Sequence, residues 1–85
     1  VFPENGEPSS FTLGDAPADA QTLHAWVPAG CWFGACLKQP ASTDAYALVS
    51  CVVAPGFDFR DFSFADRSPL LTRFPGHEAT ITALT

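Results

Sequence analysis

One segment, Ala45 to Ala54, restricts the fold more than any other part of the chain. It is apolar apart from Ser50, is rich in valine, and carries no charge or proline between its ends. The apolar run is about half as long as the roughly 20 residues that a membrane-spanning helix needs. Valine favours strands, and apolar residues on both faces are typical of a buried strand. The sequence therefore predicts a central strand that must be covered on both faces, and no membrane span.

The size and composition of the chain indicate a small packed domain. A chain of 85 residues makes one domain, and this size buries only about 60% of the surface that the unfolded form exposes. Hydrophobic residues make up 47% of the chain and charged residues 15%, which argues against disorder. Nine acidic residues face four basic ones, and the basic residues form no cluster. Nucleic acid is therefore not an expected partner.

The N-terminal part of the chain has the pattern of short strands joined by turns. Asn5-Gly6 is a strong signal for chain reversal and predicts a loose hairpin. Alternation of apolar residues predicts a strand over residues 21–27, and the turn from Pro28 to Gly30 leads into a second strand over residues 31–37. A polar, proline-bearing loop is expected from Lys38 to Asp44.

The C-terminal part combines one alternating segment with helix signals. Four phenylalanines alternate with polar residues over 57–64, which predicts a strand with a bend near Arg60, two rings on each face. Ser68-Pro69 is a good helix start, with serine as the N-cap, and Pro75-Gly76 ends that helix. A second short helix is expected over residues 77–84.

Three cysteines bear on the compartment of the protein. Cys31, Cys36 and Cys51 lie in apolar, strand-like runs, which predicts reduced, buried and poorly reactive thiols. One disulfide with a spare thiol, or one reactive cysteine, are the alternatives. Reduced thiols favour a reducing intracellular compartment. Because the chain has no methionine and begins with Val1, we expect either that an upstream segment was removed, which fits an organellar location, or that the sequence is part of a longer chain.

Three linked motifs resemble an uncharacterised family of small cupins. They are VPAGCWFGA at residues 27–35, YALVSCVVAPGFDF at residues 46–59, and the set Asp61-Phe62, Ala65 to Arg67 and Leu70-Leu71. Cupins of this family are jelly-roll barrels similar in shape to sugar-nucleotide epimerases. The resemblance covers about Phe11 to Leu84 and implies the C-terminal half of such a barrel. The expected fold is mainly β, a half barrel of about five or six strands followed by one or two short C-terminal helices. Residues 1–85 would form a single partial cupin domain, with strands in 1–64 and short helices in 68–84.

The same resemblance implies that metal ligands are missing. The family carries His, Arg and Glu residues in the first half of its barrel, and no such stretch is present here. Metal-binding cupins place a histidine three residues after a Pro-x-Gly turn, where this chain has Phe33. His24 and His77 have no second ligand at suitable spacing. We therefore expect no metal, no cofactor and no catalytic residue in this chain.

Two groups of residues remain as candidates for a site. The aromatic side chains and one histidine that could line a cavity for a flat or sugar-like ligand are His24, Trp26, Trp32, Phe33 and Tyr46. An ordinary aromatic core explains them more simply, because a half barrel cannot enclose a ligand. Asp58, Asp61 and Asp66 are close enough in sequence for paired carboxylates, but capping and local ion pairs with the neighbouring arginines explain them with fewer assumptions.

These observations favour a non-catalytic structural or interaction subunit over an enzyme. The unpaired central strand would then be completed by other protein chains, either in a larger assembly or in a homo-oligomer. The alternative is the C-terminal part of a cupin of isomerase or epimerase type, or of a small-molecule-binding barrel, whose N-terminal half is missing from this sequence.

Overall fold

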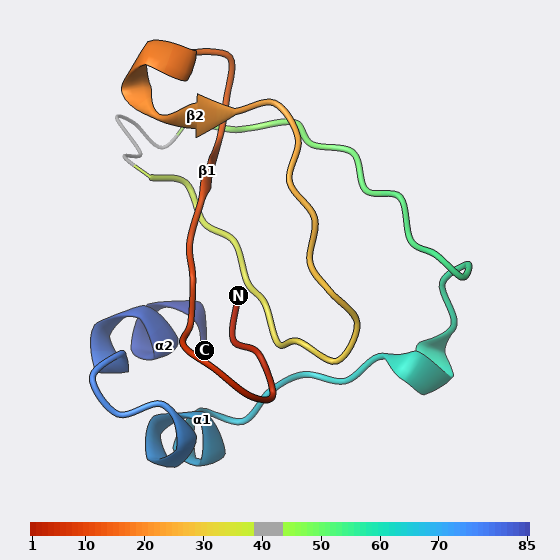
Figure 1. Ribbon diagram of the computed structural model, residues 1–85, viewed down its shortest axis with the longest axis vertical. Helices are drawn as coiled ribbons and strands as arrows, with labels where there is room; N and C mark the ends of the chain where they lie inside the picture. Colours follow the sequence, from red (N-terminus) through yellow and green to blue (C-terminus); the bar gives the residue numbers. More distant parts are fainter. Residues whose placement is uncertain (39–43) are drawn as a thin grey trace. The chain divides into compact units, whose positions relative to one another are not determined.

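The computed structural model describes residues 1–38 and 44–85 and contains short elements joined by long irregular segments (Figure 1). The chain divides into two compact units, residues 1–38 and 39–85. In chain order the elements are β1 (Thr12–Leu13), η1 (Pro17–Asp19), β2 (Gln21–Thr22), η2 (Phe59–Asp61), α1 (Arg67–Arg73) and α2 (Glu78–Leu84), where η marks a 3-10 helix. The expected mainly β half barrel of five or six strands is therefore wrong, since the described residues hold two strands of two residues each. The predicted loop at 38–44 lies largely outside the described residues.

The first unit contains the one sheet of the described chain. Strands β1 and β2 pair in parallel, with Thr12 opposite Gln21. The side-chain oxygen of Gln21 accepts a hydrogen bond from the backbone N–H of Ala16 at 3.2 Å. The Gln21 carboxamide also fills the space that a Cβ on Gly14 would need. A side chain at position 14 would therefore displace the Gln21 carboxamide and its hydrogen bond to Ala16.

The predicted reversal at Asn5-Gly6 is confirmed as a closed loop. The backbone groups of Val1 and Ser9 exchange two hydrogen bonds, of 2.8 and 3.0 Å, at the base of this loop. Gly6 has a φ of +115°, a conformation that favours glycine. Next to the loop, Phe2 and Trp32 form an isolated antiparallel bridge with hydrogen bonds of 2.7 and 3.0 Å. Phe2 is buried.

The long strands expected from the sequence do not form. Of the predicted strand over 21–27, residues 21–22 are β2 and the rest is irregular, and of the strand over 31–37 only the Trp32 bridge forms. Residues 45–54 contain no strand, and η2 replaces the strand expected over 57–64. A strand is stable only when its N–H and C=O groups meet a neighbour, and the described part of the chain offers no such neighbour to residues 45–54.

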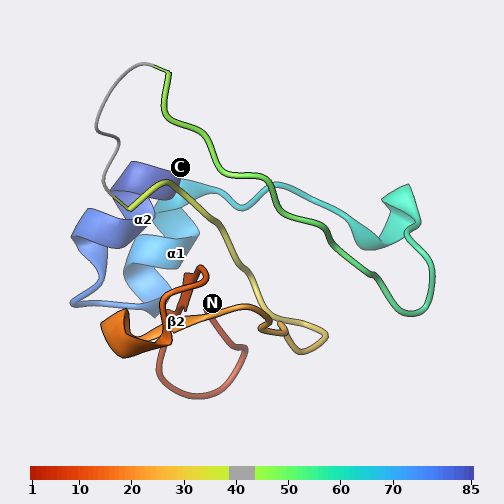
Figure 2. The same cartoon turned by 90° about the horizontal axis from the view of Figure 1, so that it is seen from above.

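The two predicted helices are confirmed and form the best-packed part of the second unit. Figure 2 shows α1 and α2 side by side. Leu70, Phe74 and Ile81 are the buried apolar residues described in this unit, and Ile81 is only 1% exposed. The N-cap of α1 is Asp66 rather than the expected Ser68, so the helix begins two residues earlier. The guanidinium of Arg67 donates to the Thr85 hydroxyl at 2.9 Å and thereby joins the start of α1 to the end of α2.

Candidate interaction surface

Residues 46–53, the apolar segment, expose side chains that a folded domain normally hides. Leu48 is 93% exposed and Val52 is 97% exposed. Tyr46, Val49 and Val53 are also exposed. No residue between Asp44 and Asp58 carries a charge, and no backbone hydrogen bond is recorded within 45–57 among the described residues. The segment thus combines uncovered apolar side chains with backbone donors and acceptors for which the described residues supply no recorded partner.

Four phenylalanines gather directly after the apolar segment. The ring centroids of Phe57 and Phe59 lie 5.0 Å apart, and those of Phe62 and Phe64 lie 5.1 Å apart, both edge to face. The rings of Phe57 and Phe62 join the two pairs at 6.0 Å. This phenylalanine cluster (Phe57, Phe59, Phe62, Phe64) remains exposed. The strand prediction placed two rings on each face. It is wrong because the turn of η2 interrupts the alternation and brings Phe62 back toward Phe57.

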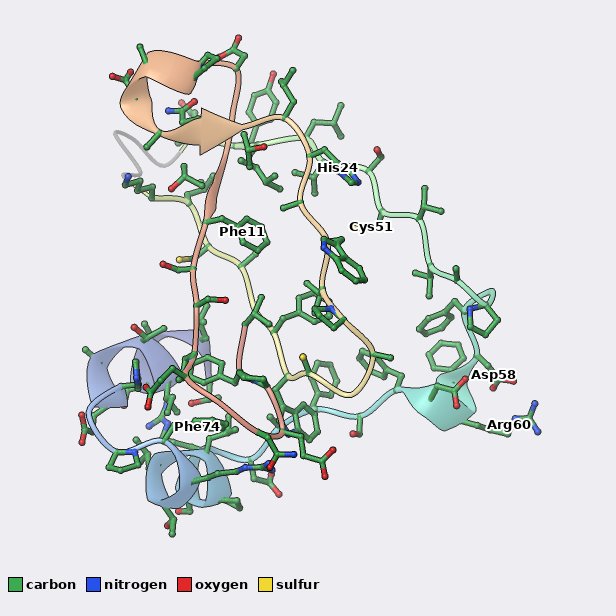
Figure 3. The ribbon with its side chains drawn as sticks, in the orientation of Figure 1. Phe11, His24, Cys51, Asp58, Arg60 and Phe74 are labelled. Carbon is green, nitrogen blue, oxygen red and sulfur yellow. The ribbon has the colours of Figure 1, made fainter. Side chains whose placement is uncertain are left out.

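Asp58 and Arg60 hold η2 in place beside the cluster (Figure 3). The Oδ1 of Asp58 accepts from the backbone N–H of Arg60 at 2.8 Å, so Asp58 is the N-cap of η2. Its Oδ2 accepts from Nε and from a terminal nitrogen of Arg60 at 3.0 and 2.6 Å. These side-chain and backbone hydrogen bonds lower the pKa of Asp58 and the side-chain bond raises that of Arg60.

This arrangement confirms capping and ion pairing as the role of Asp58. A carboxylate whose pKa is lowered stays ionised near neutral pH and cannot serve as a general acid there. The side chain of Arg60 is 88% exposed, so the pair lies in water and adds little stability. The pair shapes the backbone at η2, and through it the arrangement of the phenylalanine rings.

The five residues proposed to line a cavity are distributed over both units. Tyr46 belongs to the second unit and the other four to the first. Trp26, His24, Phe33 and Tyr46 are exposed, while Trp32 is partly buried and engaged through its backbone with Phe2. The hydroxyl of Thr22 donates to the backbone oxygen of His24 at 2.8 Å. Their role in a ligand cavity stays a prediction.

All three cysteines are unbridged, as expected, but Cys36 and Cys51 are exposed and Cys31 is partly buried, so the prediction of buried thiols is wrong. Within residues 1–38 and 44–85, no group of three potential metal ligands comes together. No helix in the described parts has the length and apolar character needed to cross a bilayer.

The phenylalanine cluster is the feature that the sequence pattern did not predict. The sequence does contain an indication of the turn at η2, namely Asp58 two residues before Arg60. Aspartate favours the N-cap of a short turn, and the arginine side chain can reach back to bond with it. This local signal competed with the period-two pattern of the phenylalanines, which predicts a strand only if a neighbouring strand is available.

Comparison with known proteins identifies the family. No curated protein and no solved structure matches the chain significantly. A family model described as "Cupin superfamily (DUF985)" matches residues 1–65. The matched range includes the apolar segment and the phenylalanine cluster, and ends just before α1. Since the match covers most of the chain, the protein belongs to this family of the cupin superfamily.

Proposed function

We propose that this protein is a non-catalytic cupin-like structural or interaction subunit, and that another polypeptide covers its apolar segment. The observation that carries the proposal is the exposure of Leu48 and Val52, at 93% and 97%, in an uncharged stretch that has no backbone hydrogen bond to any described residue. Exposed apolar patches of this kind mark protein interaction sites in soluble proteins.

The total exposed area supports the same proposal. The chain exposes 7434 Å², whereas one compact protein of 9.0 kDa exposes about 4,900 Å². Two separate compact bodies of half that mass would together expose about 5,900 Å². The excess therefore does not depend on how the two units are placed. We propose that a partner removes part of this excess surface from water.

Burial of the apolar segment would offset much of the free-energy cost of association. Each large apolar side chain contributes about 1.5–3 kcal/mol when fully buried. Association costs about 4–15 kcal/mol in lost translational and rotational freedom and in ordering. Five exposed side chains, those of Tyr46, Leu48, Val49, Val52 and Val53, therefore offset much or all of that cost before the phenylalanine cluster is counted.

Strand addition is the binding mode that fits the backbone. A partner strand beside residues 45–54 would satisfy the free N–H and C=O groups, while its neighbours covered the two apolar faces. The exposed large side chains of the segment would then supply specificity through pockets on the partner.

The first test measures the association state of the 85-residue chain by size-exclusion chromatography with light scattering. We expect self-association or non-cooperative unfolding, and strong binding of the dye anilinonaphthalene sulfonate. The double variant Leu48→Asp with Val52→Asp should bind clearly less dye and be more monomeric. The matched control is Leu23→Asp, because Leu23 is 82% exposed and lies in the other unit. A stable monomer that unfolds cooperatively would refute the proposal.

A second candidate is the C-terminal part of a cupin barrel of isomerase, epimerase or small-molecule-binding type. Membership of the cupin superfamily favours it. In that case an N-terminal half, on the same precursor or on another chain, would cover the apolar segment and supply acid–base residues. Turnover of a sugar nucleotide by the natural full-length protein distinguishes this candidate from a non-catalytic subunit.

A further inference from the structure

Asn5 is the single asparagine of the chain, and glycine follows it. The pair lies at the exposed bend of the closed loop between Val1 and Ser9. No hydrogen bond is recorded for the Asn5 side chain or for the Gly6 N–H in the described residues. Both reacting groups, the side-chain amide and the following backbone nitrogen, are therefore accessible and uncommitted.

The surroundings of Gly6 leave room for these groups to approach one another. Gly6 has a φ of +115°, and the atom nearest to a Cβ placed on it is Cγ of Pro3 at 3.9 Å. A residue without a side chain leaves its backbone nitrogen open to a neighbouring carbonyl, which is why glycine occurs where backbone must approach closely. The two hydrogen bonds between Val1 and Ser9 hold the ends of the loop, and Asn5 and Gly6 are exposed at its bend.

We propose that Asn5 is a site of spontaneous deamidation and isoaspartate formation. The Gly6 nitrogen loses its proton to solvent and attacks Cγ of Asn5, so that a new C–N bond closes a succinimide ring. The Cγ–Nδ2 bond breaks, and the nitrogen leaves as ammonia after it gains a proton. Water then opens the ring at either carbonyl. Attack at Cγ gives aspartate, and attack at the main-chain carbonyl gives isoaspartate.

The product changes both the charge and the backbone of the loop. One added carboxylate takes the formal charge of the chain from -5 to -6. In isoaspartate the chain runs through the side-chain carbon, so the loop between Val1 and Ser9 becomes one carbon longer. This site is separate from the apolar segment, and the inference stands whether or not the proposed function is correct.

The test incubates the full chain in mildly alkaline buffer and follows residue 5 by peptide mass mapping. Methyl transfer by a purified isoaspartyl methyltransferase quantifies the isoaspartate. The same incubation in urea gives the rate for the unfolded chain. We expect the native rate to lie within a few-fold of the unfolded rate, Gly6→Ala to react several-fold more slowly, and Asn5→Gln to give no product at this position.

Two results would overturn the proposal. The first is a native rate an order of magnitude below the rate in urea, which would mean that the folded loop protects Asn5. The second is an equal rate in the Gly6→Ala chain. Because the unfolded Gly6→Ala chain can be compared with the unfolded wild type, a folding defect in the variant cannot hide either result.

Discussion

Ile81 is the side chain on which the pairing of α1 and α2 depends most, and Ile81→Ala should open that pair. Ile81 is 1% exposed and lies in a helix of seven residues. Helices this short are marginal in water without tertiary packing. Replacement of isoleucine by alanine removes about three methylene equivalents, worth about 0.8 kcal/mol each, and leaves a cavity. The expected loss is about 2–4 kcal/mol.

Alanine has a higher helix propensity than isoleucine, which returns a few tenths of a kcal/mol. The matched control is therefore Thr80→Ala, which makes a similar propensity gain at an exposed position of the same helix. Amide hydrogen exchange in α1 and α2 measures the opening free energy of the pair. We expect exchange to accelerate at least tenfold in Ile81→Ala and to slow slightly in Thr80→Ala, since 1.4 kcal/mol corresponds to tenfold. Equal exchange rates in the two variants would show that Ile81 is not the packing centre.

Three further predictions concern groups at the surface. Arg67→Lys keeps the positive charge but loses the 2.9 Å hydrogen bond to the Thr85 hydroxyl, so amide exchange in the final turn of α2 should rise a few-fold. Unchanged exchange would mean that this bond does not stabilise the end of α2. The pKa of Asp58, measured by carbon NMR, should lie below 3.8 and rise toward it in Arg60→Gln but not in Lys38→Gln, which removes one positive charge from the other unit. Since the folded pKa is lowered, Asp58 stabilises η2 above about pH 4 and this contribution disappears as the pH falls through the lowered value. A thiol reagent should label Cys36 and Cys51 rapidly in the native chain, and slow labelling of either would show that its exposure is lost in solution.

Local signals in the sequence predicted local structure well. The spacing of Leu70 and Phe74 and the stop at Pro75-Gly76 define α1, and these depend only on residues within the helix. The helix begins at Arg67, two residues earlier than Ser68-Pro69 predicts, and the side chain of the N-cap residue Asp66 makes no capping hydrogen bond, so the capping preference of aspartate does not explain the earlier start. Asn5-Gly6 likewise predicted its own loop, because the positive φ at position 6 depends on the glycine there and needs no distant partner.

Signals that need a distant partner failed. The valine-rich sequence over 45–54 predicts a strand only if other strands pair with it and cover it. The described part of the chain provides no such strands. For the same reason, the candidate cavity residues could be named from the sequence but not brought together, because a cavity is made by a closed sheet. The phenylalanine cluster was missed because the local contact between Asp58 and Arg60 forms a turn within residues 57–64. The alternating phenylalanines of that segment had predicted a strand.

The uncovered apolar segment also has a consequence for the abundance of the protein in a cell. Extended, uncharged, valine-rich segments without proline are those that aggregate and that chaperones and proteases recognise. A newly made chain without its partner would expose this segment throughout its lifetime. Under the proposed function, copies that find a partner persist and surplus copies are degraded, so the partner's supply sets the steady-state level of this protein. Its own rate of synthesis would matter only below that limit.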